Sequence, residues 1–174
     1  MASKYQRKFA VGVGSATDGL FLALKALGLT DKSTIACPVY SYIATSGAIK
    51  RLGAKIKFID VDTQGNMGPI DPKIQVDAVL YTNLFGNVAD YPRLRKYCDK
   101  NHIPLIEDAA QSQGAWHHGV QSGKLGSISI FFISLLPGWL IFRKPHQHYQ
   151  KNNQYWQSFS IISEITNGSG GPII

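Results

Sequence analysis

Short apolar runs alternate with stretches of helical periodicity over the first 131 residues of this 174-residue chain. The apolar runs predict strands at residues 9–13, 34–38, 55–62, 78–82 and 104–107, with one more at 127–132. Apolar residues at helical spacing predict helices that end at Gly28, at Gly53 and at Asn101. Strands and helices in alternation are typical of a largely parallel sheet covered on both faces. We therefore expect an α/β fold with three layers, α/β/α, around a mostly parallel sheet.

The pattern fades after residue 132. Residues 145–160 contain no acid, and the whole segment 109–174 holds four Lys or Arg and a single acid, Glu164. Periodicity, caps and charge alternation are lost together, whereas a folded segment normally keeps them consistent. A reading-frame change near residue 132 explains this better than a divergent tail does. The expected division is a globular segment 1–131 and an aberrant or poorly ordered tail 132–174.

Charge and composition exclude several classes of function. The net charge is +7, but residues 1–108 hold 14 Lys or Arg and 10 acids with the signs interspersed, and no basic cluster stands out. A nucleic-acid partner is therefore not expected. The longest apolar stretch, residues 131–142, is too short to span a bilayer. The cysteines, Cys37 and Cys98, show no pairing pattern, which indicates a reduced, cytoplasmic protein.

Three features suggest a binding site at strand ends. Asp108 follows the strand at 104–107, where α/β sheets bind ligands, so it is either the charge partner of a cofactor or a helix cap. Small residues at 14–19 open a helix after a strand, which suits an anion such as phosphate but also fits an ordinary capped turn. Tyr40 and Tyr42 offer a flat aromatic face or are merely rim residues. The adjacent His117 and His118 have no partnering ligands nearby, so no metal site is expected.

Four blocks in this order carry a resemblance to a known family: GSATDGL at 14–20, PVYSYIAT at 38–45, NLFGNVAD at 83–90 and IEDAAQ at 106–111. A fainter fifth block is GKLGS at 123–127. Together they resemble the DegT/DnrJ/StrS family of pyridoxal-phosphate-dependent nucleotide-sugar aminotransferases. The resemblance covers residues 9–131, less than half of a typical member. It implies part of the large domain of fold-type I transferases that depend on pyridoxal 5'-phosphate (PLP).

The family's roles then fall on particular residues of this chain. Ser15, Ala16 and Thr17 match the turn that holds the cofactor phosphate. Tyr42 matches the aromatic residue that stacks on the pyridine ring, Asp108 the carboxylate bonded to the ring nitrogen, and Gln111 the residue near the phenolic oxygen. A carboxylate at the ring nitrogen favours the pyridinium form, which is the electron sink of transamination. Asn83 stands where many members carry histidine, so the resemblance assigns it no role.

One departure concerns the Schiff-base lysine that this chemistry needs. Eleven residues after Gly126, where the family has lysine, this chain has Pro137, and the next lysine, Lys144, lies in no matching context. The family moves an amino group from an amino acid, with glutamate expected, to a nucleotide-linked keto-sugar in polysaccharide or natural-product sugar biosynthesis, as a homodimer. This chain is expected to be an inactive fragment truncated at both ends. The alternatives are a non-catalytic cofactor-binding or partner-binding domain, and a generic α/β domain in which Asp108 caps a helix.

Overall fold

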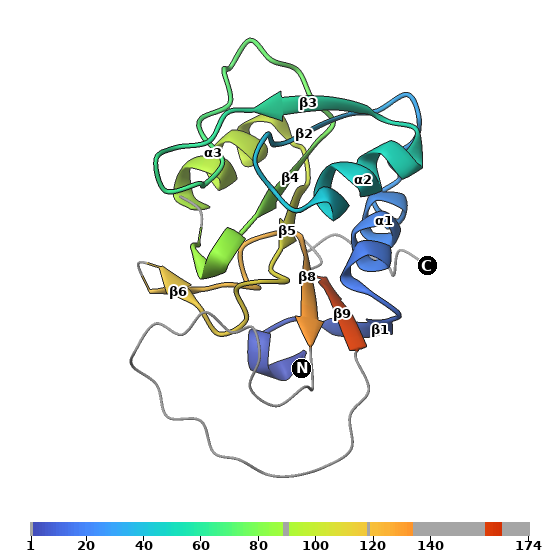
Figure 1. Cartoon of the computed structure of the whole chain (residues 1–174), viewed down its shortest axis with the longest axis vertical. Helices are drawn as coiled ribbons and strands as arrows, with labels where there is room; N and C mark the ends of the chain where they lie inside the picture. Colours follow the sequence, from blue (N-terminus) through green and yellow to red (C-terminus); the bar gives the residue numbers. More distant parts are fainter. Residues whose placement is uncertain (1, 89–90, 118, 134–158, 165–174) are drawn as a thin grey trace.

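The computed structural model describes residues 2–88, 91–117, 119–133 and 159–164 (Figure 1). Its large sheet has seven strands in the order β1-β9-β8-β5-β4-β2-β3, and β6 and β7 form a separate two-stranded sheet. In chain order the elements are η1 (Ser3–Tyr5), β1 (Phe9–Val13), α1 (Ala16–Ala26), β2 (Thr34–Pro38), α2 (Ile43–Leu52), β3 (Lys55–Ile59), β4 (Ala78–Thr82), η2 (Leu84–Gly86), α3 (Tyr91–Asn101), β5 (Leu105–Asp108), β6 (Trp116–His117), β7 (Val120–Gln121), β8 (Ile128–Ile133) and β9 (Phe159–Glu164).

Strand directions decide which ends of the elements meet. The strands β3, β2, β4, β5 and β8 are mutually parallel. The strand β9 is antiparallel both to β8 and to β1. Two reversals cancel, so β1 runs parallel to β5. The residues that follow β1 and the residues that end β5 therefore lie at the same end of the sheet, the end at which the parallel strands finish.

Helices cover both faces of the sheet, as the alternation of strand and helix predicts. Within β2, Ile35 packs into the cluster with α1 and α2, whereas its neighbour Ala36 packs into the cluster with α3. In β4, Leu80 and Tyr81 divide in the same way. Successive side chains of a strand point to opposite faces, so each central strand supplies both cores. The predicted three-layer α/β/α fold is confirmed.

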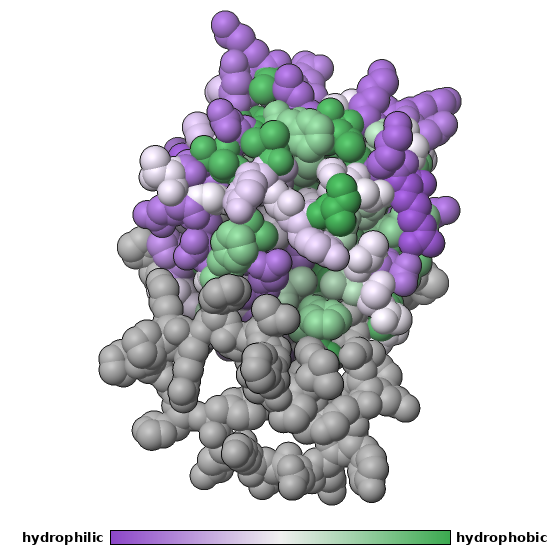
Figure 2. Space-filling view, in the orientation of Figure 1, coloured by the Kyte–Doolittle hydropathy of each residue, from purple (hydrophilic) through white to green (hydrophobic). Residues whose placement is uncertain are grey.

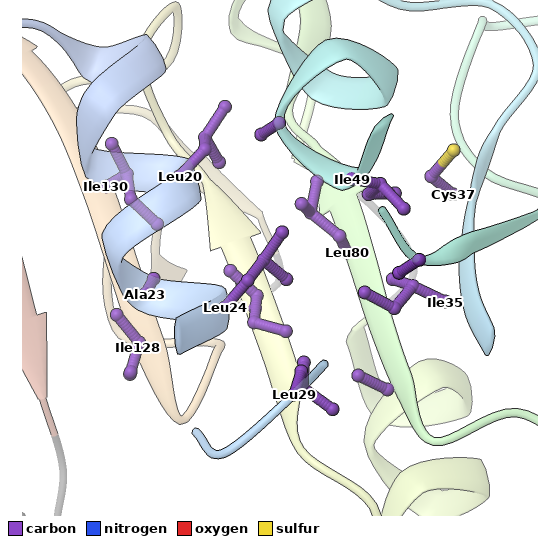
Figure 3. Packing of buried hydrophobic residues seen from close by; sticks show 14 of the residues in the cluster. Leu20, Ala23, Leu24, Leu29, Ile35, Cys37, Ile49, Leu80, Ile128 and Ile130 are labelled. Atoms are coloured by element: carbon purple, nitrogen blue, oxygen red, sulfur yellow. The ribbon is translucent and has the colours of Figure 1, made fainter. Parts of the chain in front are cut away.

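The helix α1 is fixed on the sheet by its apolar face. Leu20 and Leu24 are almost fully buried and belong to one cluster with Ile128 and Ile130 of β8 (Figure 3). Each such leucine contributes roughly 1.5–3 kcal/mol through burial. The helix spans the predicted stretch, and it ends where Gly28 adopts the left-handed backbone, with φ +73°. The helix also contacts β8 and β9.

Two expectations about the strands differ from the structure. The apolar run 9–13 predicts a buried strand, but it is the edge strand β1, so Phe9 and Val11 are 46% and 57% exposed. The pattern after residue 132 predicts no clear strand, yet β9 lies there and fills the position between β1 and β8. The division of the chain at residue 131 stays a prediction. Cys37 and Cys98 are buried and free.

Candidate functional site

Asp108 ends β5 and is buried, with 4% of its surface exposed. Its Oδ2 accepts a hydrogen bond from the Thr45 hydroxyl at 3.3 Å, and its Oδ1 accepts one from the Ala110 amide at 3.2 Å. Burial raises the pKa of Asp108 from 3.8 to about 6; the two hydrogen bonds oppose the shift, and the neighbouring Glu107 adds to it. Within the described part of the chain, no basic side chain forms an ion pair with this carboxylate. Such a group favours a cation as its partner.

The alternative of a helix cap is wrong for Asp108. Its carboxylate does accept the Ala110 amide, but residues 109–117 contain no helix that it could cap. The short β6 and β7 follow instead.

The first turn of α1 presents backbone donors at the same end of the sheet as Asp108. Ser15 is the N-cap, and its Oγ accepts the Asp18 amide at 3.0 Å. The amides of Ala16 and Thr17 have no acceptor among the described residues. Free amides and the helix dipole together favour an anion here. The Thr17 side chain is exposed.

An acid also stands in this turn. The Ser15 hydroxyl donates to Asp18 Oδ2 at 2.8 Å, and Arg51, near the end of α2, donates to Asp18 Oδ1 at 2.8 Å. The hydrogen bond from Arg51 and then that from Ser15 lower the pKa of Asp18. Arg51 therefore offsets a negative charge that would otherwise oppose an anion at Ala16 and Thr17.

Tyr42 immediately precedes α2 as its N-cap residue, and its side chain is 62% exposed. Its carbonyl accepts the Thr45 amide at 3.0 Å, so the residue that contacts Asp108 also fixes the backbone that carries Tyr42. Val39, Tyr40 and Ile43 beside it are more than half exposed as well. Hydrophobic residues also reach the surface on the face shown in Figure 2, between hydrophilic margins.

Gln111 lies three residues after Asp108, and its Oε1 accepts the Phe85 amide at 3.0 Å. Phe85 has a left-handed backbone, with φ 55°. Because the side-chain oxygen faces a donor, the Gln111 amide nitrogen is turned away from Phe85 and keeps its protons for another acceptor.

A buried polar network lies under the site. Glu107 is fully buried, and its carboxylate accepts the Asn83 side-chain amide at 2.8 Å and the backbone amides of Gly123 and Leu125 at 2.6 and 2.9 Å. The Asn83 backbone amide donates to the Asp108 carbonyl at 3.0 Å. Asn83 thus joins the strand end that carries Asp108 to the turn before β8. The sequence blocks contain these residues, but nothing in them indicates this role.

The predicted site residues fall into three groups. Ser15, Ala16 and Thr17 form the first turn of α1; Tyr42 and Asp108 are linked through Thr45; and Gln111 lies beside Phe85. The strand order and directions bring the three groups to the end of the sheet at which the parallel strands finish. Pro137, the position expected for lysine, lies outside the described residues.

Comparison with known proteins identifies the family. The model of the DegT/DnrJ/EryC1/StrS aminotransferase family matches residues 1–134. The chain belongs to this family. The UDP-N-acetyl-3-dehydro-alpha-D-glucosamine 3-aminotransferase of Acidithiobacillus ferrooxidans is 34% identical over 128 residues, which are 70% of this chain and 34% of that protein.

Solved structures agree with this assignment. DesV of S. venezuelae is 29% identical, with a TM-score of 0.70 over 92% of this chain and 41% of DesV. NtdA of Bacillus subtilis with bound cofactor PMP shares the fold at 22% identity, with a TM-score of 0.73 over 95% of this chain and 35% of NtdA. The chain thus spans well under half the length of the relatives that it matches.

Two further expectations concern metals and membranes. Among the described residues, which include His117 but not His118, no three side chains of His, Cys, Asp or Glu gather as a metal site would need. None of the described helices has the length and apolar character needed to cross a bilayer.

Proposed function

We propose that residues 1–131 form the cofactor-binding part of an aminotransferase large domain and that they bind PLP or its amine form. The buried carboxylate of Asp108, which has no ion pair in the described part of the chain, carries this proposal. A buried acid at a strand end costs stability unless a cation meets it. A protonated ring nitrogen is such a cation. When bound, the cofactor supplies an electron sink for the carbon from which a proton is removed.

The donor groups of the chain fit the rest of the cofactor. Ser15, Ala16 and Thr17 bind the phosphate through the free amides and the dipole of α1. The exposed ring of Tyr42 packs against the planar pyridine. The Gln111 amide nitrogen donates to the phenolic oxygen, because its own oxygen already binds the Phe85 amide.

Transfer of the amino group needs one more residue, a lysine that takes up and returns a proton. The sequence has Pro137 at the matching position, and proline has no titratable group. We infer that this chain binds the cofactor without completing the reaction. In an intact relative the substrates would be an amino-acid donor, with glutamate expected, and a nucleotide-linked keto-sugar.

The setting and assembly follow from the same proposal. Two buried free thiols suit a reducing cytoplasm. The exposed apolar residues beside Tyr42 suit contact with a second copy of the chain, as expected for this family.

Titration with pyridoxamine 5'-phosphate tests the proposal, because this amine form carries no aldehyde and cannot react with surface lysines. We expect saturable binding that Asp108→Asn weakens at least about tenfold, the loss of one charge-assisted hydrogen bond. The matched control is Asp99→Asn, at an exposed acid on α3. Equal affinity in the Asp108 variant, or no binding by the unaltered chain, would overturn the proposal.

The missing turnover has its own test. PLP is added to the full chain, the mixture is reduced with borohydride, and the mass of each lysine-containing peptide is measured. We expect no lysine that is labelled stoichiometrically and protected by pyridoxamine 5'-phosphate. One such lysine, together with measurable amino transfer, would show that the chain is a complete catalyst.

A further inference from the structure

The Thr45 hydroxyl binds Oδ2 of Asp108, and two further hydroxyl groups bind Thr45. Thr45 Oγ1 lies 3.3 Å from Asp108 Oδ2, 2.7 Å from Ser41 Oγ and 3.2 Å from Thr82 Oγ1, and Ser41 donates to Thr82 at 3.0 Å. Thr45 and Thr82 are buried, with 1% and 4% of their surfaces exposed. These residues come from the loop before α2, from α2 and from the end of β4.

The number of hydroxyl protons determines the direction of the hydrogen bonds in this cluster. Three hydroxyl protons serve four oxygen–oxygen contacts, and an ionised carboxylate can only accept. When Asp108 is charged, the Thr45 proton therefore points to Oδ2. Since Ser41 donates to Thr82, Thr45 in turn accepts from Thr82. Donors arranged in series polarise one another, so the last one binds the charge more strongly than a lone hydroxyl does.

We propose that Thr45, supported by Ser41 and Thr82, is a positioning residue that holds the Asp108 carboxylate in its charged form and in one orientation. This inference rests on the proposed function, since the orientation serves the ring nitrogen of the cofactor. With Oδ2 held by Thr45 and Oδ1 by the Ala110 amide, the carboxylate cannot rotate without breaking both bonds. The remaining acceptor positions of the carboxylate then keep a fixed direction.

Two effects oppose the charged form of Asp108. Glu107, its neighbour on β5, disfavours the charged form, while burial disfavours it most. From α2 the Thr45 hydroxyl binds Asp108, and from the following loop the Ala110 amide does. The Thr82 hydroxyl of β4 acts through Thr45. Within the described residues, hydrogen bonds rather than ion pairs keep this carboxylate charged.

The test uses the full chain without cofactor, labelled with 13C at the aspartate carboxyl groups. The Asp108 signal is assigned by its absence in Asp108→Asn. In Thr45→Val we expect Asp108 to titrate about one pH unit higher, the loss of one hydrogen bond to a charged group. Thr45→Ser should titrate as the unaltered protein does, because it keeps the hydroxyl. The exposed Thr63→Val is the matched control.

A second readout is the affinity for pyridoxamine 5'-phosphate. We expect Thr45→Val to lower it about tenfold and Thr45→Ser to restore it to within about twofold. An unchanged Asp108 titration in Thr45→Val would overturn the inference, as would a shift that Thr45→Ser fails to reverse. If Thr45→Val does not fold, Thr82→Val decides in the same way, with a smaller upward shift expected. If the unaltered chain did not bind pyridoxamine 5'-phosphate, the proposed function would be overturned. The titration of Asp108 would still decide the role of Thr45.

Discussion

Arg7 and Glu107 bind the same turn, Arg7 through the backbone carbonyls of the turn and Glu107 through its backbone amides. Arg7 donates to the carbonyls of Gly123 and Gly126 at 2.7 and 2.9 Å, while Glu107 accepts the amides of the same two glycines at 2.6 and 3.2 Å. Both side chains also bind the Ser129 hydroxyl, at 2.6 and 2.8 Å. The turn that leads into β8 is therefore fixed from the N-terminal segment on one side and from β5 on the other. Glu107 is next to Asp108, so this network also fixes the strand end at the candidate site.

Replacing Arg7 with methionine is expected to destabilise the fold strongly. The change keeps much of the side-chain volume but leaves buried carbonyls, and the Glu107 carboxylate close by, without this cation. Removing one member of such a buried network costs about 3–5 kcal/mol. Urea unfolding followed by circular dichroism measures the loss, with Lys32→Met at an exposed position as the control. A change below about 1 kcal/mol would show that the network is not a main support of β8.

The same turn depends on Gly126 for space. A Cβ atom there would lie 2.5 Å from the Ile128 carbonyl oxygen and 2.8 Å from the Glu107 amide nitrogen. These are backbone atoms that cannot move without disturbing β5 and β8. Gly126→Ala is therefore expected to cost at least about 3 kcal/mol or to prevent folding. Gly47→Ala, where no atom lies within 4 Å of the added carbon, is the control and should leave the unfolding midpoint unchanged or raised.

Asp108→Asn is expected to stabilise the folded protein at neutral pH while it weakens cofactor binding. Burial raises the folded pKa from 3.8 to about 6, so the contribution of Asp108 to stability is full below pH 4 and is lost as the pH rises through 6. Asparagine has no such loss. The stability of the variant relative to the unaltered chain should therefore rise between about pH 4 and 7, by roughly 2–3 kcal/mol.

Paired urea titrations of the two proteins across this pH range measure the difference. Acids that do not interact with Asp108 titrate equally in both proteins, so their effects cancel. A difference that stays flat between these pH values would show that Asp108 has an ordinary pKa in the folded protein.

Gln111→Glu is expected to keep the contact with Phe85 and to weaken binding of the cofactor. A glutamate oxygen still accepts the Phe85 amide, but the second oxygen has no proton to donate to the phenolic oxygen of the ring. We expect about tenfold weaker binding of pyridoxamine 5'-phosphate and a smaller effect for Gln111→Met, which repels nothing. Fluorescence titration gives both affinities. If the glutamate variant bound as tightly as the unaltered chain, the Gln111 nitrogen would have no role in binding.

The sequence predicts the elements better than it predicts the contacts that hold the site. The helix α3 ends at Asn101, as predicted. The small residues before α1 and the strand-end Asp108 lie at one end of the sheet, as the parallel arrangement requires. Those signals are local: an apolar period, a cap, a strand end. The assigned cofactor roles of Ser15, Ala16, Thr17, Tyr42, Asp108 and Gln111 stay predictions.

The supporting contacts join residues far apart in the chain, and periodicity carries no information about them. Thr45 is 63 residues from Asp108, and Arg7 is 116 residues from Gly123. Either residue alone reads as an ordinary polar position. Likewise, β9 becomes a strand through pairing with β1 and β8 on both sides, which no pattern within its six residues indicates.

The Arg51–Asp18 pair is expected to control the affinity of the α1 turn for phosphate. Asp18 places a negative charge in the first turn, and Arg51 offsets it at 2.8 Å. Arg51→Gln should weaken binding of pyridoxamine 5'-phosphate about two- to fivefold at low salt, because the acid then repels the phosphate unopposed. Asp18→Asn should strengthen binding, and in that background Arg51→Gln should have a smaller effect. The four affinities, measured at low and high salt, form a double-mutant cycle. An equal effect of Arg51→Gln in both backgrounds would mean that Arg51 acts on the phosphate independently of Asp18.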